Sequence, residues 1–277
     1  MVGMSLLAAA SIFMAGDSTM CNYSDKQYPQ QGWGQQLPNF TVKGVEVKNK
    51  AIGGRSSKSF INEGRWQSIL DESKPGDFVV IQFGHNDAAK QKPERHCTKE
   101  EYKENYRRFI REARAKSLKP VLATSIIHIG GMTENPDGTT SVRASAAGVG
   151  TYVDATREIG AEMKVPVVDL NSYAKEKFEK IGAEKVRKLY LCIKAGEYDR
   201  FTQDHNDRCH TRDAGANFYA RGFVTLVKKQ RLEIARLFKD PRKVLFRPIP
   251  KSGPKGVKGS DQNALDDGEE PYIPGED

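Results

Sequence analysis

Short, uninterrupted apolar runs recur along the first 170 residues, and they predict buried β-strands. The clearest runs are 11–15 (SIFMA), 78–83 (FVVIQF), 120–127 (PVLATSII) and 166–170 (PVVDL). Val42, Val45 and Val47 lie in a further candidate strand. Continuous apolar runs of this length are typical of strands that are covered on both faces, as in a parallel sheet.

Helical periodicity separates these runs. Thr98 and Glu101 have the spacing of a capping box, in which a hydroxyl and a carboxylate each satisfy a free backbone N–H at the start of a helix. Apolar residues then recur at helical spacing at Tyr102, Tyr106, Phe109, Ile110 and Ala113, and again at Tyr152, Ala155, Ile159 and Met163.

A last helix is predicted from about Asp213 to Phe238. Its apolar face consists of Ala216, Ala220, Phe223, Val227, Ile234 and Phe238. The alternation of strands and helices implies crossover connections. We therefore expect an α/β fold with a central, doubly wound parallel sheet.

The length of 277 residues suits one large domain. We place this domain at 11–240. Residues 241–277, rich in Gly, Pro and acidic side chains towards the end, are expected to form an extended or disordered tail. Residues 1–10 (MVGMSLLAAA) are either the remnant of a signal peptide, with cleavage after Ala10, or the start of the first strand. Lys and Arg are absent ahead of this apolar stretch, but we adopt export and expect a secreted or periplasmic protein.

Basic residues outnumber acidic ones by 44 to 36, which gives a net charge of +8. Such a balance favours polyanionic partners, although a solvated basic surface without a partner explains it equally well. No aromatic-basic recognition motif is visible, so we do not expect nucleic acid as a partner. No later segment has 18 consecutive apolar residues, so no membrane span is expected.

Four cysteines, none of them in a CxxC pair, leave the redox state open between disulfides and free thiols. They are Cys21, Cys97, Cys192 and Cys209. The segment 204–210 (DHNDRCH) is crowded with possible metal ligands. Because no second cluster has the spacing of a metal site, we expect no metal.

Three loops that follow predicted strands carry candidate chemistry, because ligands of open parallel sheets bind beyond the carboxyl ends of the strands. They are 16–19 (GDST), 51–57 (AIGGRSS) and 84–87 (GHND). A serine on a tight glycine-containing turn exposes its hydroxyl, and an asparagine amide can donate to a developing oxyanion. Each loop also has an ordinary interpretation: a helix N-cap, a connection and an Asx-turn.

Asp207 and His210 add a further candidate pair. An aspartate three residues ahead of a histidine can accept a hydrogen bond from one imidazole nitrogen, which leaves the other nitrogen free as a base. His96 and His128 have no evident partner and are interpreted as structural or solvated.

Taken together, the blocks GDS, a glycine-containing loop, GHND and DxxH resemble the SGNH hydrolases. More closely, the segments AGDSTM, NKAIGGRSSKSF, QFGHND, AGEY and DRCHTRDAGA resemble the rhamnogalacturonan acetylesterases of carbohydrate esterase family 12. The resemblance extends over about residues 11–237. It implies a three-layer α/β/α, flavodoxin-like SGNH-hydrolase fold and a serine esterase that needs no cofactor.

By resemblance, Ser18 is the nucleophile, His210 the general base and Asp207 the residue that orients His210. The oxyanion donors would be the backbone N–H groups of Ser18 and Gly54 and the side-chain amide of Asn86. Asp17 is interpreted as a structural anchor of the Ser18 turn.

Two features depart from the family pattern. Cys209 replaces the usual threonine before the catalytic histidine, which suggests either a disulfide to Cys192 or a small packing residue. The loop after PVLATSII reads HIGGMTENPDG and lacks the paired arginines often found there. The polysaccharide is therefore less firmly indicated than the deacetylation.

The resemblance implies an enzyme that removes O-acetyl groups from an acetylated acidic polysaccharide, rhamnogalacturonan. We expect this enzyme to be a monomer. Two alternatives remain open. One is an SGNH esterase that acts on acetylated xylan, simple esters or lipids, and the other is a non-catalytic carbohydrate-binding relative.

Overall fold

The computed structural model describes residues 10–143 and 148–246. Of the N-terminal segment 1–10, with its two interpretations, residues 1–9 are not described, and of the predicted tail 241–277 residues 247–277 are not. Within the described ranges no helix is both long enough and apolar enough to cross a bilayer.

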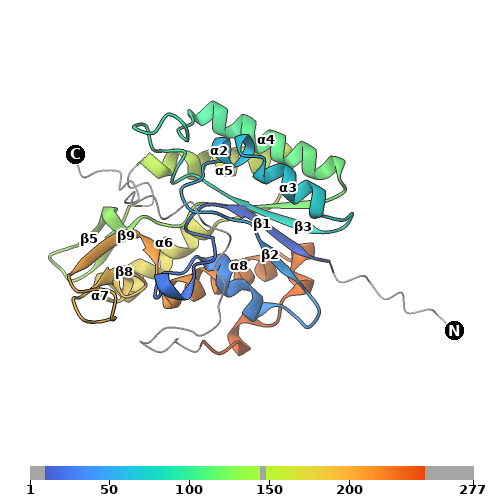
Figure 1. The fold of residues 1–277 in the computed structure, drawn as a ribbon. Coiled ribbons are helices and arrows are strands. Elements are labelled where there is room, and N and C mark those ends of the chain that lie inside the picture. The colour runs from blue at the N-terminus through green and yellow to red at the C-terminus, as the bar shows by residue number, and fades with distance from the viewer. Residues whose placement is uncertain (1–9, 144–147, 247–277) are drawn as a thin grey trace.

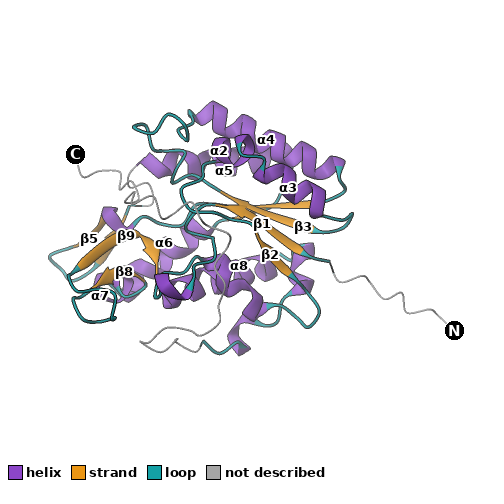
Figure 2. Ribbon diagram, viewed as in Figure 1, coloured by secondary structure: helices purple, strands orange, loops and turns teal. Residues whose placement is uncertain are grey.

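A parallel sheet of five strands forms the centre of the molecule (Figures 1 and 2). Its order is β2 (Val47–Asn49), β1 (Ile12–Gly16), β3 (Phe78–Gln82), β4 (Lys119–Ala123) and β7 (Val167–Val168), and every neighbouring pair is parallel. The predicted fold class is confirmed. The run 120–127 was predicted as one strand, but the strand ends at Ala123 and the remaining residues continue as the loop that follows it.

Successive residues of the central strands face opposite sides of the sheet, and both sides are buried. Ile12 and Met14 pack into one apolar core, whereas Phe13 and Ala15 pack into the other. Neighbouring side chains of a strand point to opposite faces, so a strand that is covered twice must be apolar at every position. This explains the continuous apolar runs in the sequence.

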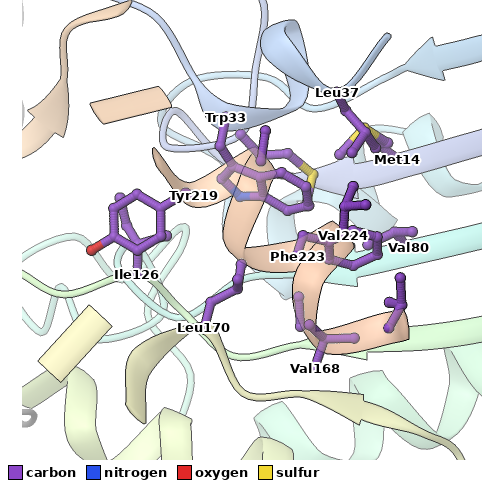
Figure 3. Close-up of a cluster of buried hydrophobic side chains, with 14 of the residues drawn as sticks. Met14, Trp33, Leu37, Val80, Ile126, Val168, Leu170, Tyr219, Phe223 and Val224 are labelled. Atoms are coloured by element: carbon purple, nitrogen blue, oxygen red, sulfur yellow. The ribbon is translucent and has the colours of Figure 1, made fainter. Parts of the chain in front are cut away.

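Helices cover both faces (Figures 1 and 2). One layer contains α2 (Ser57–Asn62), α3 (Arg65–Glu72), α4 (Lys99–Ala115) and α5 (Val149–Met163). The other contains α1 (Trp33–Gln36), α6 (Leu170–Ile181), α7 (Ala183–Arg187) and α8 (Asp213–Lys229). Figure 3 shows the core of the second layer, where Trp33 lies next to Phe223 at a ring distance of 5.2 Å.

The predicted capping box begins α4. The Thr98 hydroxyl accepts from the Glu101 backbone N–H at 3.2 Å, and the Glu101 carboxylate accepts from the Thr98 backbone N–H at 2.7 Å.

The prediction of a last helix extending to Phe238 is wrong. The helix α8 ends at Lys229, because Arg231 takes a left-handed backbone conformation (φ 53°) that an α-helix cannot contain. The turn at Arg231 leads into a 3-10 helix, η5 (Glu233–Leu237). Ile234 and Leu237 are buried there, so the apolar pattern is kept although the helix is broken.

Two small antiparallel sheets, which the sequence did not reveal, lie outside the central sheet. They pair β5 (Met132–Glu134) with β6 (Thr140–Val142) and β8 (Tyr190–Ile193) with β9 (His205–Thr211). Short 3-10 helices connect other segments: η1 (Asp25–Gln27), η2 (Leu37–Phe40), η3 (Ile129–Gly131) and η6 (Pro241–Lys243). The helix η6 falls at the start of the predicted tail, and the Arg221 guanidinium binds the backbone oxygens of Pro241 and Val244.

Candidate active site

The loop after β1 is a tight turn that presents Ser18. Asp17 is fully buried, and its Oδ1 accepts from the backbone N–H and the hydroxyl of Thr19 at 2.9 and 2.7 Å. The backbone N–H groups of Met20 and Cys21 both donate to the Asp17 backbone oxygen. Asp17 therefore anchors the turn. The ordinary interpretation of Ser18 as a helix N-cap is wrong, because residues 18–20 form turns and no helix begins there.

A buried polar network lies beneath this turn. The Gln82 amide, at the end of β3, donates to the Thr19 hydroxyl at 2.7 Å, and the Trp33 indole N–H donates to the Gln82 oxygen at 2.8 Å. The Tyr23 hydroxyl donates to the Ser18 backbone oxygen at 2.9 Å. Buried hydrogen bonds of this kind fix the backbone of the turn, because breaking one leaves a polar group without a partner.

The three predicted catalytic side chains form one hydrogen-bonded series. His210 Nε2 lies 2.8 Å from Ser18 Oγ, and His210 Nδ1 lies 2.7 Å from Asp207 Oδ2. Both Asp207 and His210 are almost completely buried, with exposed fractions of 5% and 4%. This is the geometry in which a serine hydroxyl can pass its proton to an oriented imidazole.

A β-bulge in β9 brings His210 to Ser18. Asp207 pairs with Leu191 of β8, but the next pairing joins Thr211 to Tyr190. The intervening residues Arg208–His210 have no partner on β8 and leave the ladder. Bulges re-aim side chains in this way and are common next to active sites.

The pKa of Asp207 is held well below its usual range. Burial alone would raise it, but the charge of His210 and the hydrogen bonds around the carboxylate outweigh burial. Its Oδ1 accepts from the backbone N–H groups of Cys209 and His210 at 2.8 and 2.9 Å, while Oδ2 faces the imidazole. Asp207 is therefore ionised at neutral pH.

The pKa of His210 is raised above its ordinary value of 6.5. Burial favours the neutral imidazole, but the charge and hydrogen bond of Asp207 outweigh it, and Asp17 adds to the effect. The carboxylate contact at Nδ1 also fixes the tautomer, so that Nε2 of the neutral ring is the lone-pair nitrogen that faces Ser18.

The second predicted loop lies beside the Ser18 turn. The Ile52 backbone N–H donates to the Gly16 oxygen at 3.0 Å. Gly54 has a positive φ of 74°, which favours glycine at this position. Within the described residues, neither the Ser18 nor the Gly54 backbone N–H donates to a protein acceptor. Both are therefore available to a ligand.

The third predicted loop completes the arrangement. The Asn86 side-chain amide donates to the Arg55 backbone oxygen at 3.2 Å, and its Oδ1 accepts from Arg95 at 3.3 Å. The neighbouring Asp87 is fully buried and accepts from the Ser57 N–H and hydroxyl at 3.0 and 2.5 Å. The loop after β3 is thereby fixed to the loop after β2.

Two buried carboxylates lie behind the Ser18 and Asn86 loops. Burial raises the pKa of Asp17 to about 6, with hydrogen bonds from Thr19 acting against it. Burial also raises the pKa of Asp87 to about 7, and the nearby Asp17 contributes in the same direction. The Oδ2 atoms of Asp17 and Asp87 accept no hydrogen bond from any described residue.

Two further histidines, His96 and His128, contact backbone groups as structural residues do. His96 Nδ1 lies 2.8 Å from the Asp87 backbone oxygen, and His128 Nδ1 accepts from the Gly130 N–H at 3.2 Å. Burial lowers the pKa of both His85 and His128 to about 4, so both are neutral.

The suggested Cys192–Cys209 disulfide is not formed. The Cys192 thiol faces Asn206 and the Asp207 backbone oxygen, whereas Cys209 leaves the strand with the bulge and its sulfur lies 3.6 Å from His85 Nδ1. Cys209 is thus a small buried packing residue. In the described ranges no three acidic, histidine or cysteine side chains are grouped closely enough to hold a metal ion.

Sequence reasoning missed the residues that support the site. Gln82 and Arg95 bind side chains of the predicted loops directly, and the Trp33 indole holds Gln82 in place. Trp33 and Gln82 read as ordinary core positions, and Arg95 lies in a charged segment (KQKPERH) that looks solvated. Only the β9 bulge had a local signal, because the pair Asp207 and His210 cannot both point the same way from a regular strand.

Comparison with known proteins gives consistent results. The sequence profile of the GDSL-like lipase/acylhydrolase family matches residues 14–191. The probable rhamnogalacturonan acetylesterase YesY of Bacillus subtilis (strain 168) is 36% identical over 219 residues, which cover 77% of this chain and 90% of YesY. The rhamnogalacturonan acetylesterase RhgT of the same organism is 33% identical over 205 residues, covering 74% and 84%.

A solved structure shares the fold. The crystal structure of the Bacillus subtilis protein YxiM superposes with a TM-score of 0.67 at 30% identity. The match covers 81% of this chain and 57% of that one, so the present chain spans little more than half of YxiM.

Proposed function

The chain belongs to the GDSL-like lipase/acylhydrolase family, and from this premise we propose that it is a serine esterase that removes O-acetyl groups from a plant cell-wall polysaccharide, rhamnogalacturonan. The observation that carries the proposal is the buried series Asp207–His210–Ser18, with contacts of 2.7 and 2.8 Å. The relatives named rhamnogalacturonan acetylesterase support the acyl group and the polymer.

The reaction begins at Ser18. His210 Nε2 takes the hydroxyl proton as Ser18 Oγ forms a bond to the acetyl carbonyl carbon. The carbonyl oxygen becomes an oxyanion that accepts from the backbone N–H groups of Ser18 and Gly54 and from the Asn86 amide. Asp207 stays ionised and stabilises the imidazolium that forms.

The tetrahedral intermediate then collapses. The bond between the carbonyl carbon and the sugar oxygen breaks, and His210 gives its proton to that oxygen, so the sugar hydroxyl leaves and acetyl-Ser18 remains. Water then repeats the sequence: it gives a proton to His210 and adds to the acetyl carbon. The bond to Ser18 Oγ breaks, the proton returns to Ser18, and acetic acid is released.

The charge of the chain agrees with an acidic polymer. A net charge of +8 attracts a polysaccharide whose galacturonate units carry carboxylates. This attraction is screened by salt, so the KM for the polymer should rise with ionic strength, whereas the KM for a neutral ester should change little.

The proposal is tested by measuring acetate release. The substrates are acetylated rhamnogalacturonan, acetylated xylan and an aryl acetate. The variant is Ser18→Ala, and the matched control is Ser68→Ala on the exposed face of α3. We expect the parent and Ser68→Ala to release acetate fastest from rhamnogalacturonan, and Ser18→Ala to lose at least about 10³-fold in kcat.

Each other outcome corrects a different part of the proposal. Full activity of Ser18→Ala would exclude Ser18 as the nucleophile. A preference for xylan or for the aryl ester would replace the polymer but keep the deacetylation. No turnover of any ester by the parent chain would favour a carbohydrate-binding relative.

We also propose that the protein acts outside the cytoplasm. A cell-wall polymer is too large to enter the cell, so an esterase that acts on it must be located outside the cytoplasm. The full-length chain, produced in its native host, should then be recovered in the medium or periplasm. Retention of all activity in the cytoplasmic fraction would contradict this.

A further inference from the structure

The guanidinium of Arg95 lies beside two of the three proposed oxyanion donors. Its Nη1 donates to Asn86 Oδ1 at 3.3 Å. The position that a Cβ on Gly54 would occupy is 3.4 Å from the same nitrogen. The Arg95 Nε also binds the exposed Glu94 carboxylate at 3.1 Å, on the side of the guanidinium away from Nη1, and only 16% of the Arg95 side chain is exposed, so the guanidinium is partly shielded from water next to the reaction centre.

We propose that Arg95 is a positioning residue of the oxyanion hole: it holds the carboxamide of Asn86 in the orientation that presents an N–H to the ester carbonyl. The inference rests on the proposed function, because it takes Asn86 as an oxyanion donor.

The hydrogen-bonding capacity of Asn86 supports this role. A carboxamide has one acceptor oxygen and two N–H donors. Here the oxygen accepts from Arg95, and one N–H position is directed at the Arg55 backbone oxygen at 3.2 Å. The second N–H remains for the substrate. Rotation of the amide by 180° would set its NH₂ group against the guanidinium and its oxygen against the Arg55 oxygen, and both contacts would be repulsive.

The positive charge adds a second effect. A cation on Oδ1 withdraws electron density through the amide, which makes the remaining N–H a stronger donor. In a partly buried site this polarisation is less screened than it would be in water. Arg95 therefore strengthens the contact that forms as the oxyanion develops, and it acts through Asn86.

The loop after β3 is folded to bring Arg95 back to Asn86, nine positions earlier in the chain. The Cys97 backbone N–H donates to the Asp87 oxygen at 3.1 Å, and Lys58 of α2 donates to the Pro93 oxygen at 2.9 Å. The other arginine of this region, Arg55, binds Glu63 through Nε at 3.0 Å and the Gly53 backbone oxygen through Nη1 at 3.0 Å. Of these two arginines, only Arg95 donates a hydrogen bond to the Asn86 side chain.

The test is a double-mutant cycle on an aryl acetate. The variants are Arg95→Met, Arg95→Lys, Asn86→Ala and the combination of Arg95→Met with Asn86→Ala. The control is Arg111→Met, on the exposed face of α4. Arg95→Met should lower kcat about 10- to 100-fold with KM nearly unchanged. The reason is that a misoriented Asn86 amide no longer donates well to the oxyanion of the transition state. Arg95→Lys, whose ammonium can still donate to Oδ1, should recover part of the loss.

The cycle separates positioning from a merely structural role. In the Asn86→Ala background, Arg95→Met should cost nothing further. An equal loss in both backgrounds would overturn the inference, because Arg95 would then act independently of Asn86. Thermal unfolding checks the fold, and if Arg95→Met is unfolded, Arg95→Lys carries the same comparison.

The inference can fail while the proposed function stands. If Arg95→Met keeps the parental kcat while Ser18→Ala and Asn86→Ala lose activity, the positioning role is excluded and the esterase is not. If Ser18→Ala and Asn86→Ala are fully active as well, the proposed function itself fails.

Discussion

Asp207 uses both of its carboxylate oxygens, and the two have different tasks. Oδ1 accepts two backbone N–H groups and fixes the bulge, while Oδ2 binds His210 Nδ1. One side chain thus shapes the loop and orients the base. This explains why the two residues lie only three positions apart, and why the proposed site depends on an aspartate at position 207.

Asp207→Asn should lower kcat on the order of 10⁴-fold, because an amide NH₂ facing Nδ1 stabilises the wrong tautomer of the base. Steady-state kinetics with the aryl acetate measure the loss. Asp204→Asn is the matched control, since Asp204 belongs to the same segment but pairs with Lys194 on the surface. A loss below tenfold in Asp207→Asn would contradict the assigned role.

The pH dependence of kcat/KM reports the protonation state of the proposed general base, His210. The reaction requires neutral His210, and the Asp207 carboxylate stabilises the charged form, so its pKa is raised above 6.5. The activity kcat/KM should therefore fall as the pH drops through a midpoint above 6.5. In Asp207→Asn the midpoint should move to lower pH. A profile that is flat in this range, or a shift in the opposite direction, would exclude His210 as the titrating base.

Among the elements, the carboxyl ends of β1 and β3 and the bulge in β9 position the proposed catalytic residues. Gly16 pairs with Gln82 at the carboxyl ends of neighbouring strands, so the loops that follow leave the sheet side by side. Gly84, between β3 and Asn86, has a φ of 140°, and a Cβ there would lie 2.3 Å from the Ser125 hydroxyl oxygen. The path of the chain to Asn86 therefore requires a glycine.

Gly84→Ala should reduce the free energy of unfolding by about 3 kcal/mol or more, since it combines backbone strain with a steric clash. Gly44→Ala is the control, because Gly44 also has a positive φ (89°) but has open space around it; it should cost only about 1–2 kcal/mol. Denaturant titration measures both. Removing the hydroxyl with Ser125→Ala should recover part of the loss in Gly84→Ala, and equal costs of the two glycine variants would show that the clash is absent.

Across the whole molecule, the central sheet separates two apolar cores, and each core holds one of the 2 tryptophans of the chain. Trp33 stacks on Phe223 at 5.2 Å in one core, and Trp66 packs on Phe109 at 4.7 Å in the other. The strands contribute alternate residues to both cores, so the loss of packing in either layer would expose one apolar face of the strands that the other layer also packs on.

The two cores should therefore unfold together. In Trp33→Phe the fluorescence of Trp66 reports one core, and in Trp66→Phe that of Trp33 reports the other. Within each variant, the fluorescence midpoint in a denaturant titration should coincide with that of far-UV circular dichroism. A fluorescence transition that precedes the loss of helix in either variant would show that one layer unfolds separately.

Much of this architecture is encoded locally. The apolar runs at 78–83 and 120–127 predicted strands because a strand covered twice is apolar at successive positions, and the Thr98–Glu101 spacing predicted the start of α4. The sequence also singled out Ser18, Gly54, Asn86, Asp207 and His210. Their roles were inferred from the resemblance to a family. Their proximity was expected only from the rule that ligands of open parallel sheets bind beyond the carboxyl ends of the strands.

Tertiary structure decided the rest, because the interactions concerned join distant residues. Ser18 and His210 are 192 positions apart, and their contact of 2.8 Å depends on a bulge that only the pairing of β8 with β9 defines. The free thiols of Cys192 and Cys209 follow from the same bulge. The end of α8 and the contact of Arg95 with Asn86 depend on backbone turns that no periodicity encodes. The sequence by itself indicated which residues belong to the site, whereas the folded chain determined which of them are in contact and how each side chain is oriented.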